Sequence, residues 1–181
     1  MSRKLTAALF AFAVLGVSAL VSAHKLTAGK PAGSPGRVAA SVGSSTTSPR
    51  ALPSASMTDI NGQEIANGEL TRGRVLLVYL TTSCEPCVEQ AKIISRLSES
   101  APPGVRIYGV SFERPAQVAT FVREFDLKYS MLIDSGGKLA HSLDIHYFPS
   151  AYLVEDGMIT KAWRGVTRDG ADFRRQLLTE N

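Results

Sequence analysis

The sequence predicts an α/β protein built on a central mixed β-sheet with helices on both faces. Between residues 74 and 134, apolar strand-like runs alternate with helical patterns, an order typical of helices packed on a sheet. Two turn signals, Asn61-Gly62 and Asp156-Gly157, each lie between strand-like pieces and predict a β-hairpin at either end of the ordered region. The N-terminal hairpin is an addition to the sheet.

The individual elements follow from their hydrophobic patterns. Residues 74–82 form a near-continuous apolar run, which suits a strand covered on both faces. In residues 85–99 the polar side chains share one stripe and the apolar ones the opposite side, which predicts an amphipathic helix. The same reasoning predicts strands at 105–112, 130–134, 151–154 and 158–165, helices at 115–125 and 169–180, and a helical turn near 137–144.

The first 23 residues predict a targeting segment. Arg3 and Lys4 precede an apolar run at 5–23, and Val21-Ser22-Ala23 has the small-residue spacing of a signal-peptidase site. The run is also long enough to cross a bilayer as a helix. It is therefore either a signal peptide removed after Ala23 or a retained membrane anchor, and in both cases the rest of the chain is exported.

Residues 24–54 are rich in Gly, Pro, Ser and Ala, and they contain no aromatic and no acidic residue. This composition predicts a flexible linker ahead of a folded domain at 55–181. The first 54 residues carry six Lys and Arg, whereas residues 55–181 carry 14 basic and 16 acidic side chains. The domain balance gives no reason to expect a basic face, so we exclude nucleic acid as a partner.

The chain has two cysteines, Cys84 and Cys87, in a Cys-Glu-Pro-Cys motif. As a structural disulfide they would close a loop of about four residues and contribute only ~2 kcal/mol. A tetrahedral metal site needs four ligands, of which the motif supplies two. With His146 as a third ligand, a copper-binding or metallochaperone module is one alternative function.

A redox couple fits the position of the motif better. Cys84 falls where a strand ends and a helix begins, so unpaired backbone N–H groups and the positive end of the helix dipole stabilise its thiolate. Cys87 lies one turn further on the buried stripe, where it can attack a mixed disulfide. Pro86 in the first turn costs no helical hydrogen bond. Glu85 disfavours the neighbouring thiolate, which predicts a less oxidising couple.

With Cys-x-x-Cys after a strand and Phe148-Pro149 before another strand, the chain resembles the thioredoxin superfamily. Within it, the chain is similar to the TlpA/ResA-like, membrane-tethered thiol–disulfide oxidoreductases of the bacterial cell envelope. The similarity runs from about residue 55 to the end and includes the Asn61-Gly62 hairpin and "EDGMITKAWRG" at 155–165. It implies a thioredoxin-like fold for residues 55–181.

The resemblance also implies roles for individual residues. Cys84 would be the attacking nucleophile and Cys87 the resolving thiol of a redox-active Cys84–Cys87 disulfide. Pro149 would be a cis-proline that lets the backbone of Phe148 pair with a substrate peptide beside Cys84.

The implied enzyme reduces protein disulfides on the periplasmic side of the envelope, with apocytochrome c as a substrate in cytochrome c maturation. A membrane electron donor would reduce the enzyme again, and we expect no cofactor.

Two residues depart from the pattern. Val78 stands where thioredoxins have a buried acid, and Gln90 stands where some reducing relatives carry Glu, so the usual carboxylates for deprotonating the resolving thiol are absent. A peroxiredoxin-like peroxidase is a further alternative, because Thr81-x-x-Cys84 matches the Thr-x-x-Cys of that group. The proline that normally precedes this motif is absent here.

Overall fold

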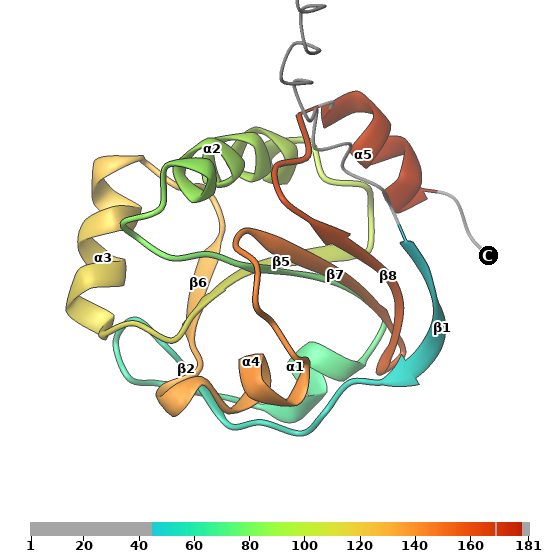
Figure 1. Ribbon diagram of the computed structural model, residues 1–181, viewed down its shortest axis with the longest axis horizontal. Coiled ribbons are helices and arrows are strands. Elements are labelled where there is room, and N and C mark those ends of the chain that lie inside the picture. The colour runs from blue at the N-terminus through green and yellow to red at the C-terminus, as the bar shows by residue number, and fades with distance from the viewer. Residues whose placement is uncertain (1–44, 169, 179–181) are drawn as a thin grey trace, which may run out of the picture. The chain divides into compact units, whose positions relative to one another are not determined.

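The computed structural model describes residues 45–168 and 170–178, which include one eight-stranded mixed sheet (Figure 1). Its strands lie in the order β1-β8-β7-β4-β5-β6-β2-β3. β4 pairs parallel with β5, and β5 pairs parallel with β6, whereas β4 pairs antiparallel with β7. The predicted mixed sheet is confirmed. The strands are β1 (Ser45–Ala51), β2 (Met57–Asp59), β3 (Glu64–Ile65), β4 (Arg74–Tyr79), β5 (Val105–Ser111), β6 (Ser130–Ile133), β7 (Ser150–Glu155) and β8 (Met158–Arg164).

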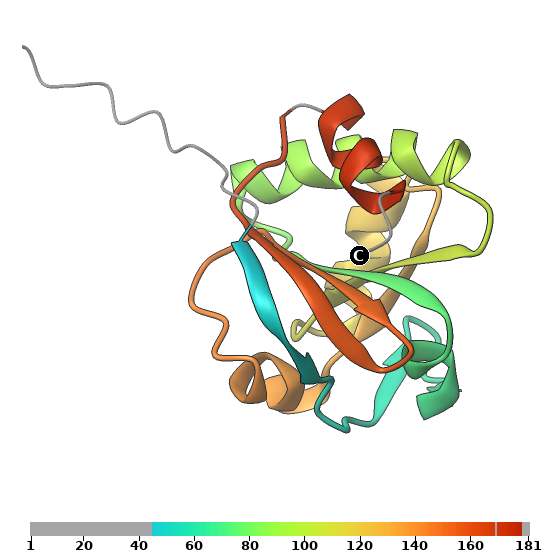
Figure 2. The ribbon, with the colours of Figure 1, turned by 90° about the vertical axis from the view of Figure 1, so that its right-hand side faces the viewer.

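Helices cover both faces of this sheet, as predicted (Figures 1 and 2). Alternate residues of the central strand β4 point to opposite sides, because side chains in a strand alternate. Leu76 and Val78 pack with α2, α3 and α5, whereas Leu77 and Tyr79 pack with α1 and α4. The helices are α1 (Asn67–Thr71), α2 (Glu85–Glu99), α3 (Pro115–Glu124), α4 (Lys138–Ser142) and α5 (Gly170–Leu178), with a short 3-10 turn, η1 (Ser135–Gly137), before α4.

The Asn61-Gly62 turn joins β2 and β3, which pair antiparallel with Met57 opposite Ile65. Gly62 has a φ of 85°, a conformation that glycine adopts without strain. The carboxylate of Asp59 accepts hydrogen bonds from the backbone N–H of Asn61 and of Gln63, both at 2.8 Å. The hairpin extends the sheet beyond β6, with Thr58 opposite Ile133.

One segment of the predicted linker is ordered. Residues 45–51 form β1, which pairs antiparallel with β8, so the expectation that residues 24–54 are all linker is wrong for this part. Leu52, just after the strand, is buried and its N–H donates to the carbonyl of Gly157 at 2.8 Å. The described side chains of β1, at 48–51, are exposed, which explains why the sequence shows no hydrophobic alternation there.

The predicted signal or anchor at 5–23 and the linker at 24–44 lie outside the described residues. Across 45–168 and 170–178, no helix is both long and apolar enough to cross a membrane. These predictions about the N-terminal region therefore stay predictions.

Asp134 follows β6 and is fully buried on the face of the sheet that α4 covers. It accepts hydrogen bonds from the N–H groups of Leu139 and Ala140, at 3.1 and 2.9 Å, in the first turn of α4. It also accepts one from the Tyr79 hydroxyl at 3.3 Å. The positive end of a helix stabilises a negative charge in this place. Asp134 thus attaches α4 to the central strand.

Asp134→Ala should lower the free energy of unfolding by about 2–3 kcal/mol, because two buried N–H groups and one buried hydroxyl lose their acceptor. Urea denaturation followed by circular dichroism measures this change. Glu124→Ala, at an exposed position of α3, is the control and should change the stability by less than about 0.5 kcal/mol. Equal stability of the two variants would contradict the role assigned to Asp134.

Candidate active site

The two cysteines lie at the carboxyl end of β4, where three loops meet. Residues 80–84 continue from β4, residues 112–114 follow β5, and residues 147–149 precede β7. The parallel neighbour β5 ends at the same edge, and the N–H of Leu80 donates to the carbonyl of Val110 at 2.9 Å. The antiparallel neighbour β7 starts there, with Ser150 opposite Tyr79. The sheet order therefore brings the Cys-x-x-Cys motif and the Phe148-Pro149 segment together.

The two thiols have different surroundings. Cys84 is the N-cap residue of α2 and is partly exposed, and its Sγ lies 4.0 Å from the carbonyl oxygen of Phe148. Cys87 is fully buried on the inner face of the same helix. Its N–H donates to the carbonyl of Cys84 at 2.9 Å, and both cysteines are free thiols in this structure. Cys84 alone is placed to meet a disulfide from outside.

Burial, and after it the hydrogen bond with Cys84, raise the pKa of the Cys87 thiol to about 12. The Thr81 hydroxyl, whose Oγ1 lies 3.8 Å from the Cys87 Sγ, acts in the opposite direction. Cys87 is therefore a protonated thiol at neutral pH, and its thiolate must form during the reaction.

Glu85 and Pro86 occupy the first turn of α2, as the sequence predicts, and both side chains are exposed. The Phe148–Pro149 peptide bond is cis, which confirms that prediction. The carbonyl of Pro149 accepts a hydrogen bond from the N–H of Gly165 at 2.8 Å, which ties this loop to the end of β8.

Aromatic side chains lie in the loops before β7 and after β5, at the sheet edge where Cys84 lies. The rings of Phe112 and Phe148 meet edge to face with their centroids 5.7 Å apart. Phe112 is 43% exposed and Tyr147 is 65% exposed, which is unusual for large side chains of this kind.

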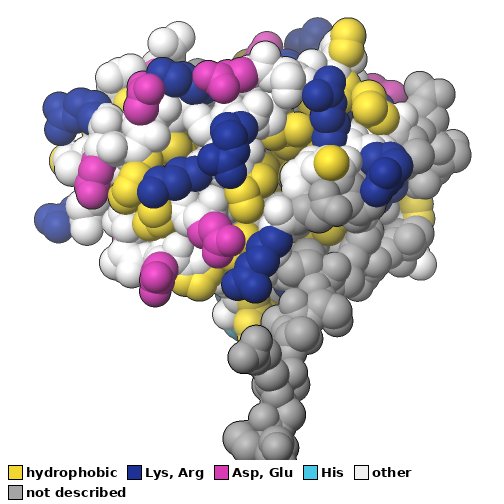
Figure 3. Space-filling view, turned by 90° about the horizontal axis from the view of Figure 1, so that it is seen from above, with side chains coloured by type: hydrophobic (Ala, Val, Ile, Leu, Met, Phe, Trp, Pro, Cys, Tyr) yellow, Lys and Arg dark blue, Asp and Glu magenta, His cyan; other side chains and the backbone are white. Residues whose placement is uncertain are grey.

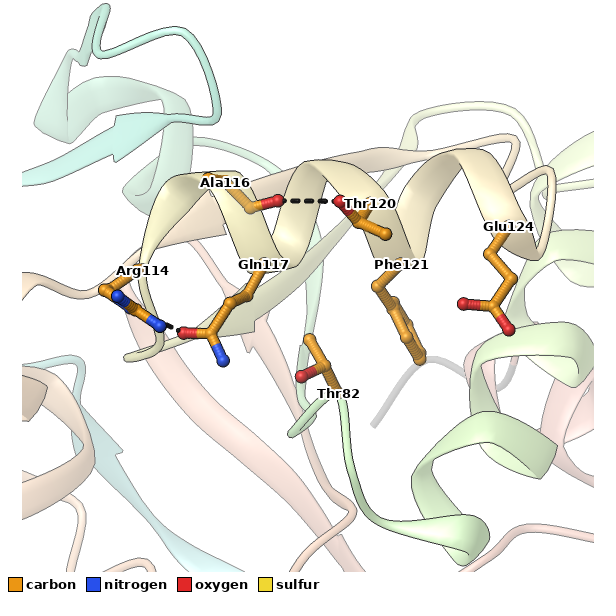
Figure 4. A pocket seen from close by; sticks show the side chains of 7 residues that line it. All are labelled: Thr82, Arg114, Ala116, Gln117, Thr120, Phe121 and Glu124. Atoms are coloured by element: carbon orange, nitrogen blue, oxygen red, sulfur yellow. Dashed lines mark hydrogen bonds between the residues drawn. The ribbon is translucent and has the colours of Figure 1, made fainter.

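A pocket of about 440 Å³ opens between the active-site loop and α3 (Figure 4). Phe121 forms its apolar part, and Arg114 and Glu124 lie at opposite ends. Its remaining lining residues are Thr82, Ala116, Gln117 and Thr120. Because Thr82 is two residues from Cys84, the pocket adjoins the reactive thiol on the side of α3.

Gln90 is buried in the helix that carries the motif, but its amide is engaged elsewhere. Its Nε2 donates to the Thr167 Oγ1 at 2.8 Å, and its Oε1 accepts from the N–H of Thr167 at 2.7 Å. Val78 packs in the hydrophobic core. Both positions therefore serve packing and cross-linking, and neither supplies a carboxylate to Cys87.

A carboxylate that the sequence analysis did not single out, Glu113, holds the active-site loop. Its Oε2 accepts from the N–H of Thr82 at 2.7 Å, and its Oε1 accepts from the Thr82 hydroxyl at 3.0 Å. The Ser111 hydroxyl donates to Oε2 at 3.1 Å. Glu113 thus joins the end of β5 to the segment that leads into Cys84. The signal in the sequence was an acid directly after a strand that ends at the same sheet edge.

The structure does not bring a metal-binding set together. His146 is exposed, and its Nε2 lies 2.7 Å from the Oδ1 of Asp144. Within the part of the chain that the structure describes, no group of three His, Cys, Asp or Glu side chains is arranged to hold a metal ion. Cys84, Cys87 and His146 are therefore not among such a group in the described residues.

Comparison with known proteins matches residues 49–162 to the AhpC/TSA family. The chain belongs to this family. Thiol-disulfide oxidoreductase ResA of Bacillus thuringiensis subsp. konkukian is 27% identical over 116 residues, which cover 62% of this chain and 67% of that protein. Thioredoxin-like protein YneN of Bacillus subtilis is 23% identical over 108 residues, 58% of this chain and 63% of that protein. The chain thus spans about two thirds of the length of these family relatives.

Solved structures agree with the family assignment at the level of the fold. A secreted Mycobacterium tuberculosis disulfide oxidoreductase, homologous to Escherichia coli DsbE, superimposes with a TM-score of 0.60 at 18% identity, covering 67% of this chain and 92% of that one. StoA from Bacillus subtilis superimposes with a TM-score of 0.58 at 20% identity, covering 70% and 98%. The predicted thioredoxin-like fold and the resemblance to ResA-like proteins are confirmed.

In this AhpC/TSA chain, Glu113→Ala should lower the rate of disulfide exchange by about 10-fold, because the loop before Cys84 loses the acceptor that positions it. Glu113→Gln keeps one carbonyl oxygen as an acceptor and should fall between wild type and Glu113→Ala. Insulin-disulfide reduction measures the rate, and thermal unfolding is followed in parallel. An unchanged rate, or a loss of rate that only tracks a lower Tm, would contradict this positioning role.

Proposed function

We propose that this chain is an exported thiol–disulfide oxidoreductase that reduces protein disulfides at the periplasmic side of the bacterial cell envelope. The observation that carries the proposal is the pair of thiols itself. Cys84 is partly exposed at the start of α2, and Cys87 is buried one turn behind it. The Cys84 sulfur can therefore attack an external disulfide, while the Cys87 sulfur stays shielded from solvent.

The reaction proceeds by two thiol–disulfide exchanges. The Cys84 thiolate attacks one sulfur of a substrate disulfide, forming a mixed disulfide and releasing the first substrate thiolate. Cys87 then attacks the Cys84 sulfur and releases the second substrate thiolate. The substrate gains two electrons, and the Cys84–Cys87 pair becomes a disulfide.

The proton of Cys87 has to leave before the second exchange. Since Val78 and Gln90 provide no carboxylate, the substrate thiolate released beside Cys84 is the base that this mechanism uses. The Thr81 hydroxyl, 3.8 Å from the Cys87 Sγ, stabilises the thiolate that forms. This route keeps Cys87 unreactive until a mixed disulfide exists.

The surroundings of Cys84 support a polypeptide as substrate. Phe112 packs edge to face on Phe148, and Phe112 and Tyr147 are exposed in the loops at this sheet edge. The carbonyl oxygen of Phe148 lies next to the Cys84 Sγ, where it can accept a backbone N–H from an extended peptide. Apocytochrome c, whose two haem-attachment thiols must be reduced, is the substrate that we propose by analogy with the ResA-like relatives.

The N-terminal segment supports the location. The apolar run at 5–23 either anchors the chain or is removed after Ala23, and both fates place the domain outside the cytoplasm. A membrane electron donor would then return the Cys84–Cys87 disulfide to the dithiol.

The peroxidase alternative is less well supported. A hydroxyl that orients a peroxide for attack by Cys84 has to point toward that sulfur. The Thr81 hydroxyl instead contacts the sulfur of Cys87.

Cys84→Ser should abolish insulin-disulfide reduction, whereas Cys87→Ser should accumulate a mixed disulfide through Cys84, because the second exchange is blocked. The full chain is expressed in the bacterium that carries it, cells are fractionated, and mass spectrometry identifies the captured protein. A membrane-impermeant thiol reagent added to intact cells should modify Cys84 if the domain lies outside the cytoplasm.

Capture of no protein by Cys87→Ser would contradict the protein-disulfide substrate. Protection of Cys84 in intact cells would contradict the location. Peroxide consumption by wild type without insulin reduction would favour the peroxidase alternative.

The couple should be reducing, with a potential below about −200 mV in equilibrium with glutathione. Glu85→Gln should raise the potential by about 15–30 mV, because removing the carboxylate beside Cys84 stabilises the thiolate and hence the reduced form. Glu89→Gln, exposed one turn further along α2, is the control and should leave the potential unchanged. A strongly oxidising wild-type potential would reverse the proposed direction of electron flow.

A further inference from the structure

A second pocket lies on the opposite half of α2, away from the cysteines. It occupies about 360 Å³ between α2 and α5. Arg96 on α2, Arg168 before α5 and Arg174 on α5 line it, and all three are exposed. Ile93, Leu97 and Ala171 form its apolar part, and Ser100 and Gly170 complete it. The pocket thus combines an apolar floor with three cationic side chains.

Among the described residues that line this pocket, none is acidic. Arg168 pairs with Glu89, with Nε and Oε1 3.6 Å apart, but the two side chains are 81% and 47% exposed. An exposed pair of this length contributes little and leaves the guanidinium free to turn toward another anion. The side chains of Asp169 and Asp172, which neighbour the pocket in the sequence, lie outside the described part.

Among the described side chains, the two remaining guanidinium groups have no carboxylate within 4.0 Å. Arg174 donates through Nη1 to the neutral Ser100 hydroxyl at 3.4 Å. Arg96 lies on the exposed side of α2, one turn from Ser100. Figure 3 looks onto this face and shows several Lys and Arg side chains, with hydrophobic side chains between them and Asp and Glu side chains nearby. Three cations at one pocket repel each other unless an anion is shared between them.

We propose that this pocket binds a phosphate group, held by Arg96, Arg168 and Arg174. Guanidinium groups match phosphate oxygens with paired N–H donors, which is why arginine serves phosphate recognition so often. The first residue of α5, Gly170, lines the pocket, and the positive end of this nine-residue helix adds to the attraction. Two sources share this chemistry, namely an anionic phospholipid headgroup and free phosphate.

The pocket is separate from the redox site. Arg96 lies twelve residues after Cys84, a span of about 18 Å along the helix. Neutral substitutions in the pocket should therefore leave disulfide exchange unchanged, and binding can be measured apart from the proposed enzyme activity.

The test titrates the full chain, held in neutral-detergent micelles, by isothermal calorimetry with three probes. These are short-chain phosphatidylglycerol, short-chain phosphatidylcholine and inorganic phosphate. The test variant carries Arg96→Gln, Arg168→Gln and Arg174→Gln. The control variant carries Arg123→Gln, Lys128→Gln and Lys138→Gln, which remove the same charge from exposed positions on and after α3 and on α4.

Phosphatidylglycerol should bind wild type and the control variant, and binding to the test variant should be at least about 10-fold weaker. Binding should also weaken as salt is raised. Inorganic phosphate binding with the same dependence on the three arginines identifies the free anion as sufficient, and its failure to bind assigns the site to the lipid headgroup. Insulin reduction and Tm should match wild type in both variants.

No binding of either anionic probe would overturn the proposal. Equal loss in the test and control variants would overturn it as well, because the attraction would then reflect net charge and not this pocket. Equal binding of phosphatidylcholine and phosphatidylglycerol to the test variant and to wild type would show partitioning into the micelle, and it too would overturn the proposal.

Discussion

Burial of the central strand on both faces is the constraint on which this molecule depends. Every residue from Val75 to Leu80 is buried, and alternate side chains enter two separate cores. A strand in this position excludes polar side chains, because a buried polar group without a partner is costly. Polar, reactive side chains can therefore be accommodated only after residue 80, where the buried segment ends. At that point the loop after the parallel neighbour β5 contributes Glu113 and the loop before the antiparallel neighbour β7 contributes Pro149, so the site is assembled at the end of one strand.

The chemistry of the pair comes from the unequal environments of two sulfurs one helical turn apart. Cys87 is buried on the inner face of α2, and its raised pKa keeps the thiol protonated until a mixed disulfide forms. Gln90, which lies on the same buried face, cross-links α2 to Thr167 by neutral hydrogen bonds. A carboxylate at that position could still accept from the N–H and the hydroxyl of Thr167, but it could not donate as the amide Nε2 does. Gln90 thus connects α2 rigidly to the segment before α5 and supplies no base to Cys87.

The same helix carries both proposed sites, one at each end. Its first residues present Cys84 at the carboxyl end of β4, and its last turns present Arg96 beside α5. The Gln90–Thr167 hydrogen bonds lie between them and hold the segment that continues into Arg168 and α5. If the chain is anchored by residues 5–23, a phosphate site on the α2–α5 face would also orient the domain on the membrane surface, and the thiol would then face a constant direction.

Local pattern was sufficient to predict the features that depend on neighbours in the chain. The strand-to-helix junction, Cys84 at the N-cap, Cys87 on the buried stripe and Pro86 in the first turn all follow from helical spacing, and the structure has each of them. The cis bond before Pro149 came from the family resemblance and was confirmed as well.

Features that join distant segments were beyond such reasoning. β1 has exposed side chains at 48–51 and pairs because β8 offers an open edge, which no pattern within 45–51 reveals. Glu113 meets Thr82 across 31 residues, and Arg174 meets Ser100 across 74. These contacts depend on strand order and on the packing of α5 against α2. A short local motif is thus enough to predict the reactive thiols. The contact of Glu113 with the loop before Cys84, and the pocket lined by the three arginines, form only when the sheet and its helices are assembled.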